Sequence, residues 1–70
     1  MLYAFVIHGK EEKQEGVFRT YQFRIEAESF ARKLLSKDIQ TDKVEIFEYD
    51  KGQFVAIDTI YNIAKQGERT

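Results

Sequence analysis

The sequence predicts an α+β fold: one small domain of order β-β-α-β-β, with a four-stranded antiparallel sheet and one helix packed on one face. Its 70 residues leave room for only one domain, since domains commonly have about 100–150 residues. Four segments are rich in β-branched and aromatic residues, and one has the apolar spacing of an amphipathic helix. We expect residues 1–62 to form the domain and residues 63–70 to form a polar C-terminal tail.

The composition excludes several classes of protein. Hydrophobic residues make up 43% and charged residues 33% of the chain, which is typical of a globular domain. The absence of cysteine excludes a disulfide framework and a thiolate metal site. A net charge of −1 argues against a general binder of polyanions. No secretion signal or membrane-spanning run is recognised, so a cytoplasmic location without membrane association is expected.

The first two strands differ in their pattern. Residues 2–8 are apolar on both alternations, which is typical of a central strand covered on both faces. Residues 9–16 form a polar loop that begins and ends with glycine. Residues 17–24 become polar at every second position from Thr20 onward, so we expect a half-exposed edge strand.

The helix is predicted over residues 26–37. Its apolar residues recur with the spacing of one helix face; they are Ala27, Phe30, Ala31, Leu34 and Leu35. With Glu26 as the N-terminal capping residue, Ile25 could pack against Phe30 as a hydrophobic staple.

Two further strands are predicted over residues 43–49 and 54–61. They are joined by a tight turn, in which Gly52 can adopt a positive φ angle. The helix returns the chain to the end where the second strand began. If the first strand is central, the sheet order 2-1-3-4 makes every pair of neighbours antiparallel.

One helix covers only one face of such a sheet, and the other face would carry many apolar residues. Strict alternation in the fourth strand places Phe54, Ala56 and Ile60 on one side. Single exposed apolar residues are normal, and twist or the tail could cover them. We favour an intermolecular surface instead, either a homodimer interface or the binding site of another protein. The candidate partner-binding residues are Phe47, Tyr49, Phe54, Ala56, Ile60 and Tyr61.

Acidic residues gather at the end where the helix begins and the second hairpin turns. The candidate acidic docking residues are Glu26, Glu28, Glu48 and Asp50, opposed locally by Arg24 and Lys51. Such charges usually form a solvated surface. The functional interpretation is that they dock on a basic surface of a partner, for example one that otherwise binds nucleic acid.

No catalytic residue, metal site or cofactor is predicted. His8 could act as a base near Glu45 or Asp58, but no nucleophile lies in a strained turn, and Ser29 and Ser36 are on a helix. Metal-binding and phosphate-binding motifs are absent from the sequence. We therefore interpret His8 as a partly exposed imidazole at a strand end.

The alternative function is a nucleic-acid-binding module. The second strand interleaves aromatic and basic residues, with Arg19, Tyr21, Phe23 and Arg24 as the candidates. The aromatic motif of RNA-binding sheets is not matched, however, and the two arginines are on opposite alternations of the strand.

No motif specific to a family is present. In its compactness and β-rich layout, the chain resembles the short proteins that phages and mobile elements make to bind and disable or redirect a host protein. That likeness covers no motif and assigns no residue a role. The sequence thus predicts a non-enzymatic protein-binding module, a small regulator or inhibitor that forms a homodimer.

Overall fold

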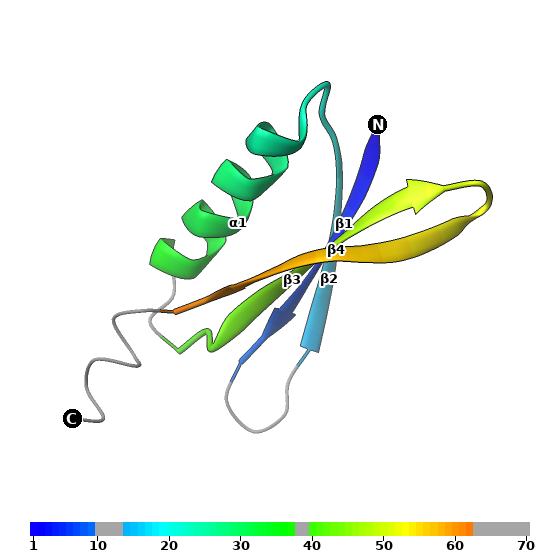
Figure 1. Cartoon of the computed structure of the whole chain (residues 1–70). Helices are drawn as coiled ribbons and strands as arrows, with labels where there is room; N and C mark the ends of the chain where they lie inside the picture. The colour runs from blue at the N-terminus through cyan, green and yellow to red at the C-terminus, as the bar shows by residue number, and fades with distance from the viewer. Residues whose placement is uncertain (10–13, 38–39, 63–70) are drawn as a thin grey trace.

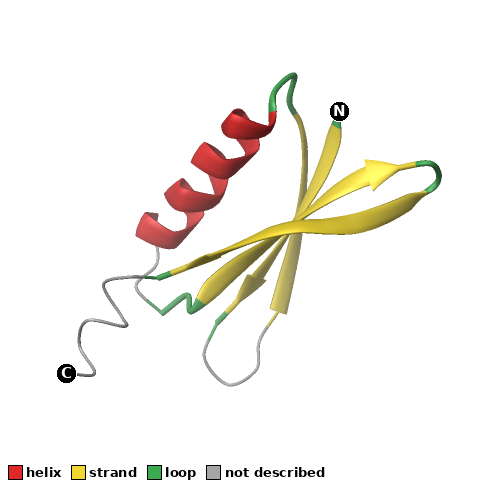
Figure 2. Ribbon diagram, in the orientation of Figure 1, coloured by secondary structure: helices red, strands yellow, loops and turns green. Residues whose placement is uncertain are grey.

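The computed structural model describes residues 1–9, 14–37 and 40–62. The elements in chain order are β1 (Leu2–His8), β2 (Gln14–Thr20), α1 (Arg24–Lys37), β3 (Lys43–Asp50) and β4 (Gln53–Tyr61). The strands form one sheet of order β2-β1-β3-β4 in which every neighbouring pair is antiparallel. Helix α1 covers one face, as Figures 1 and 2 show. The predicted fold class and strand order are confirmed.

Strand β1 lies inside the sheet because its side chains are apolar in both directions. Tyr3 and Phe5 face α1 and are fully buried, while Ala4 faces the other way and is also buried. β1 pairs with β2 along its whole length and with β3 along most of it. The prediction of a central first strand is therefore confirmed.

Strand β2 begins and ends earlier than predicted. It runs over residues 14–20, not 17–24, since Gln14 pairs with His8 and Thr20 pairs with Leu2. The length of β1 thus sets both ends of β2. Tyr21 follows the strand, and its backbone N–H donates to the Met1 carbonyl over 2.9 Å.

Helix α1 begins two residues before its predicted start because Glu26 acts as a cap from within the first turn. The Phe23 N–H donates to Glu26 Oε1 over 3.0 Å, and the Glu26 N–H donates to the Phe23 carbonyl over 3.1 Å. This is half of a capping box, with Phe23 as the capping position: the Glu26 side chain accepts from the Phe23 N–H, but the Glu26 N–H is bound by the backbone carbonyl of Phe23, which has no side-chain acceptor. The predicted staple is wrong: Ile25 is exposed, and Phe30 packs against Phe5 with ring centroids 4.9 Å apart.

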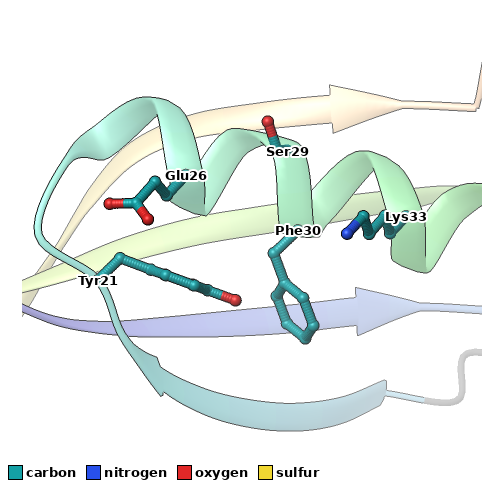
Figure 3. Close-up of a pocket in the computed structure, with 5 residues that line it drawn as sticks. All are labelled: Tyr21, Glu26, Ser29, Phe30 and Lys33. Carbon is teal, nitrogen blue, oxygen red and sulfur yellow. The ribbon is translucent and has the colours of Figure 1, made fainter.

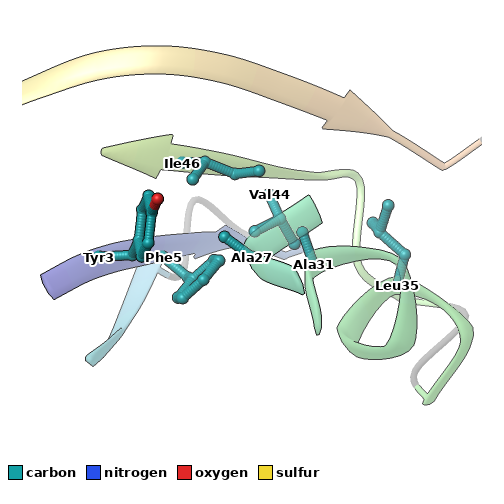
Figure 4. Close-up of a cluster of buried hydrophobic side chains, with 7 residues drawn as sticks. All are labelled: Tyr3, Phe5, Ala27, Ala31, Leu35, Val44 and Ile46. Atoms are coloured by element: carbon teal, nitrogen blue, oxygen red, sulfur yellow. The ribbon is translucent and has the colours of Figure 1, made fainter. Parts of the chain in front are cut away.

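The core lies between α1 and the two inner strands, as Figure 4 shows. The buried apolar residues are Tyr3, Phe5, Ala27, Ala31, Leu35, Val44 and Ile46. Two of the three helix residues in this set are alanines, whose small side chains let the helix approach the sheet closely. Larger residues pack around this centre, including Phe30 and Leu34.

The β3–β4 hairpin closes with a two-residue turn. Lys51 has φ 50° and Gly52 has φ 85°, the pair of positive angles that a type I′ turn requires. The predicted positive φ at Gly52 is confirmed.

Strand β4 contains an irregularity that changes which residues face the helix. Asp58 pairs with Ile46, whereas Ala56 pairs with Phe47, so Ile57 is an extra residue. A bulge of this kind reverses the alternation beyond it. The strict alternation predicted for β4 is therefore wrong: Ile60 packs against the core, and does not share a face with Phe54.

Three predicted segments lie wholly or partly outside the described residues. These are the tail over 63–70, residues 10–13 of the loop predicted over 9–16, and the start of the connection after α1; residues 14–16 of that loop belong to β2 instead. Among the described residues, no helix has both the length and the apolar character needed to cross a membrane.

Candidate functional site

The sheet face opposite α1, called here the open face, is built in rows by the strand register. Phe18 pairs with Ala4, Ala4 with Phe47, and Phe47 with Ala56, so one row crosses all four strands. The pair formed by Tyr49 and Phe54 lies one row closer to the hairpin turn.

Three rings from different strands meet on the open face; we call Phe18, Tyr49 and Phe54 the aromatic cluster. The centroids of Phe18 and Phe54 are 5.8 Å apart, and those of Tyr49 and Phe54 are 5.4 Å apart at an angle of 70°. β2 and β4 are at opposite edges of the sheet, and in a flat sheet about 14 Å would separate them. The sheet is therefore coiled enough for side chains of its two outer strands to meet on the open face.

This coiling covers part of the open face with the chain's own side chains. Ala4 is only 8% exposed, and Leu2, Val6 and Phe47 are half-buried. The rings of the aromatic cluster stay exposed, at 57% for Phe18, 45% for Tyr49 and 41% for Phe54. At about 200 Å² for each aromatic side chain, the cluster exposes about 300 Å², the lower end of the range for the largest apolar patch on a typical monomer.

The other end of the open face is polar. His8 pairs with Lys43, and its Nε2 hydrogen bonds to Oε1 of Glu45. Glu45 in turn pairs with Thr59, and Tyr61 is opposite Lys43. The rings that contact one another on the open face are thus at the end near the β3–β4 turn, while Tyr61 is exposed by itself at the polar end.

The structure brings together four of the six predicted partner-binding residues. Phe47, Tyr49, Phe54 and Ala56 lie in the two neighbouring rows at the aromatic end. Tyr61 is on the same face at the polar end, and Ile60 is on the other face, against the core.

Phe18 was missed because the even positions of the second strand were taken as its solvent-exposed side, although they are polar only from Thr20 onward. The sequence did contain a signal for such a residue. The predicted strand order already placed β2 beside β1, so an aromatic residue of β2 was expected next to β1. The correct register, which depends on the ends of β2, is what identifies that residue as Phe18.

Two of the four predicted acidic docking residues have local roles. The Glu26 carboxylate caps α1. Glu48 is opposite Tyr3 in the sheet, and its carboxylate lies 3.8 Å from the Arg24 guanidinium. Of the others, Glu28 is half-buried and Asp50 is exposed at the end of β3.

The environment of Tyr3 keeps its hydroxyl protonated. Burial raises the pKa of Tyr3, and the charge of the Glu48 carboxylate and its hydrogen bond with the hydroxyl raise it further. Arg24 acts in the opposite direction, but it is more exposed than Glu48. Glu48 therefore disfavours the ionised form of a buried phenol.

A pocket of about 260 Å³ lies between α1 and the end of β2 (Figure 3). It is lined by Tyr21, Glu26, Ser29, Phe30 and Lys33. The aromatic rings of Tyr21 and Phe30 form one side, with centroids 6.1 Å apart, and the polar side chains of α1 lie around the rim (Figure 3). Its one carboxylate already serves as the cap of α1.

The residues of the nucleic-acid alternative do not form a common surface. The Arg19 guanidinium stacks over the Phe30 ring at 5.3 Å, and Tyr21 packs against Tyr3 and Phe5. Arg24 lies beside Glu48 instead, on the helix.

The sheet separates the groups considered for catalysis. His8 and Glu45 are on the open face, whereas Ser29 and Ser36 are on α1, which covers the opposite face. A hydroxyl of α1 therefore cannot approach the imidazole. Within the described part of the chain, no group of three His, Cys, Asp or Glu side chains could hold a metal ion.

Comparison with protein-family models, curated proteins and solved structures finds no match to this chain.

Proposed function

We propose that the chain is a non-enzymatic protein-binding module, a small cytoplasmic regulator or inhibitor that docks on another protein through its aromatic cluster. The observation that carries the proposal is the convergence of Phe18, Tyr49 and Phe54 from three strands on one exposed spot. Tyrosine and other aromatic residues are enriched at the centres of protein interfaces, where they supply most of the binding energy.

The shape of the patch favours a partner that presents a small apolar projection. The cluster is compact, and the rings hold one another in place through their mutual contacts. Less side-chain entropy is lost on binding when the rings are already positioned. An interface of standard size buries about 800 Å² on each side, so the rim around the cluster must contribute as well.

Charges at the rim would orient the partner. Asp50 is exposed beside Tyr49, at the end of β3. Complementary charges at an interface raise the association rate more than the affinity. A partner with a basic rim around its apolar projection fits this arrangement, and a surface that binds nucleic acid is one of that kind.

The positions of Arg19 and Arg24 favour a protein partner over nucleic acid. Stacking platforms for single strands combine aromatic side chains with basic residues that follow the backbone. Here Arg19 is engaged by Phe30 and Arg24 lies beside Glu48, and neither belongs to the aromatic cluster.

The test compares the proteins that the wild-type chain and the Phe54→Glu variant retain from a lysate of the source cells. Phe54 is exposed, so the variant should fold, and circular dichroism checks that it does. We expect the wild-type chain to retain a specific protein and the variant to lose it.

Phe23→Glu is the matched control, because Phe23 is 61% exposed but precedes α1, outside the aromatic cluster. It should retain the same protein as the wild type. Equal retention by Phe54→Glu and the wild type, or loss in both variants, would contradict the role of the aromatic cluster.

A further inference from the structure

The outer edge of β4 is less protected than the outer edge of β2. Sheet edges in natural proteins are commonly blocked by charges, bulges or short strand length. β2 carries the charged residues Glu15 and Arg19 within its seven residues. The first half of β4, residues 53–57, has no charged residue and is exposed from Gln53 to Ala56. No described strand pairs with its outer edge.

The register shows which backbone groups of β4 point away from the sheet. A two-residue turn closes on a hydrogen-bonded pair of residues, which here is Asp50 with Gln53. Bonded and non-bonded pairs alternate along antiparallel strands, so Phe54 and Ala56 belong to non-bonded pairs with β3. Their N–H and C=O groups therefore point outward, and their side chains lie on the open face.

The free part of this edge ends at the bulge. The extra residue Ile57 interrupts the register between β3 and β4. Beyond it, the Thr59 N–H donates to Asp58 Oδ1 over 2.8 Å, so this amide already has a partner within the chain. A strand added to β4 would thus find free main-chain groups at Phe54 and Ala56 and would end near Asp58.

We propose that the partner of the aromatic cluster docks with an extended segment, called here the partner segment, which pairs with β4 as a fifth strand beside Phe54 and Ala56. This inference rests on the proposed function, because it names the part of the partner that reaches the cluster. An added strand gains affinity from main-chain hydrogen bonds and specificity from every second side chain. The pairing is antiparallel, the more stable arrangement per residue.

Side-chain size in the row that ends at Ala56 defines the partner segment further. From β2 to β4 the row contains Phe18, Ala4, Phe47 and Ala56, so large and small side chains alternate. A large apolar side chain opposite Ala56 would continue this alternation and lie beside the Phe54 ring, because paired residues share a face of the sheet. Opposite Phe54 itself, a small side chain leaves the ring in place.

Asp58 defines the charge at one end of the partner segment. Its side chain is exposed and lies where the free edge ends. No ion pair among the described residues involves it. In an antiparallel segment, a basic residue two positions before the large apolar one would approach this carboxylate. The expected pattern is therefore a basic residue, then a large apolar residue and then a small one, each two positions apart.

A second copy of the chain fits this edge less well than a segment of another protein. In a symmetric pair of β4 strands about Val55, the residue opposite Ala56 would be a second Phe54. That ring already contacts Phe18 and Tyr49 of its own chain. It is therefore held over its own sheet and does not cover a neighbouring Ala56. The large side chain of a partner segment has no such constraint.

The probe is the capped peptide Lys-Thr-Leu-Val-Ala-Thr, which places leucine opposite Ala56 and alanine opposite Phe54. Nuclear magnetic resonance of the isotope-labelled chain measures its binding up to millimolar concentration. Binding should shift the amide signals of Phe54 and Ala56 and slow their hydrogen exchange. The Val55 amide is bonded to β3, so it should exchange slowly with and without the peptide.

Two altered peptides separate main-chain pairing from side-chain contact. N-methylation of the leucine and alanine keeps the side chains but removes the two N–H donors, and should weaken binding at least about tenfold. Exchanging the leucine and alanine keeps the composition and should weaken binding about tenfold, because the large side chain then meets the Phe54 ring.

Variants of the chain test the same contacts from the other side. Ala56→Leu fills the space beside Phe54 and should weaken binding of the first peptide about tenfold. Gln14→Leu adds the same side chain at the exposed edge of β2 and should leave binding unchanged. Asp58→Asn should weaken binding about threefold at low ionic strength and less in salt. Circular dichroism checks that each variant folds.

Absence of binding at millimolar concentration, or equal binding of the N-methylated peptide, would overturn the partner segment. The proposed function would still hold if the lysate experiment with Phe54→Glu succeeds, so the two failures are distinguishable. Protection of the Phe54 and Ala56 amides that rises with the concentration of the free chain would assign the edge to a second copy and would also overturn it. Binding that N-methylation and Ala56→Leu both weaken supports it.

Discussion

Phe18 and Phe54 belong to strands at opposite edges of the sheet, yet their ring centroids are only 5.8 Å apart. The row that contains Phe18 explains how this is possible, because large and small side chains alternate along it, from Phe18 through Ala4 and Phe47 to Ala56. The small side chain of Ala4 leaves room above β1 for the two rings. The same coiling that brings the edges together therefore builds the aromatic cluster.

The contact between these rings should stabilise the domain, although both are exposed. Aromatic pairs contribute about 0.5–1.5 kcal/mol beyond the area that they bury. We expect a double-mutant cycle with Phe18→Ala and Phe54→Ala to give a coupling energy in that range from urea unfolding. Replacing Phe54 by Ala in a cycle with Phe23→Ala is the control and should give no coupling above about 0.3–0.5 kcal/mol. Additive effects of Phe18→Ala and Phe54→Ala would show that the rings do not contact each other in solution.

The pattern of apolar residues was sufficient to predict the strand order and the helix, but it did not define every face. β1 is apolar on both alternations, which places it inside the sheet and leads to the order of its neighbours. The bulge at Ile57 has no comparable signal, because Val55, Ile57 and Ile60 are all apolar and fit either face. The aromatic cluster depends on coiling of the whole sheet. The contact between Phe18 and Phe54 could therefore not be predicted before the strands were placed relative to one another. The capping role of Glu26 requires a helix that begins at Arg24, and that start depends on where β2 ends.

Glu26 should stabilise the start of α1 through the hydrogen bond that it accepts from the Phe23 N–H. Replacing it with Ala removes the acceptor and leaves that amide without its side-chain partner. We expect a loss of about 0.5–1 kcal/mol in the free energy of unfolding. Glu26→Gln keeps an oxygen acceptor and loses the charge beside the helix N-terminus, so its loss should be smaller. The prediction fails if Gln and Ala destabilise the domain equally in urea unfolding.

The stability of the domain should fall at alkaline pH because of Tyr3. Burial and the Glu48 carboxylate raise the pKa of Tyr3 above its usual value of 10.0. Between that value and the higher folded pKa, the unfolded chain releases the phenolic proton while the folded chain keeps it, which favours unfolding. The stabilising contribution is therefore complete below about pH 10 and is lost as the pH rises through the folded pKa.

Two variants separate the causes of this decline. Tyr3→Phe removes the titrating group, so its free energy of unfolding should depend less on pH above about pH 10 than that of the wild type. Glu48→Gln removes the neighbouring charge and should give an intermediate slope, since burial remains. Urea unfolding at a series of pH values measures each slope. Identical slopes in the wild type and Tyr3→Phe would exclude Tyr3 as the cause.

The turn between β3 and β4 should be stabilised by changing Lys51 and destabilised by changing Gly52. Both residues have positive φ angles, which L-residues with a side chain adopt at a cost and which glycine adopts freely. Asn tolerates this conformation best among residues with a side chain, and Asn-Gly is the preferred pair in a type I′ turn. Lys51→Asn should therefore raise the free energy of unfolding by about 0.5 kcal/mol.

Gly52→Ala is the complementary variant, because a Cβ at that position would meet no atom within 4 Å. Its effect therefore reports backbone strain and not a steric clash. We expect a loss of about 1 kcal/mol, which corresponds to a fall of about 4–8 °C in Tm for a domain of this size. Thermal unfolding of both variants at the same micromolar concentration measures the opposite shifts. A rise in Tm for Gly52→Ala, or no difference between the two variants, would mean that the hairpin does not turn through positive φ angles at these residues.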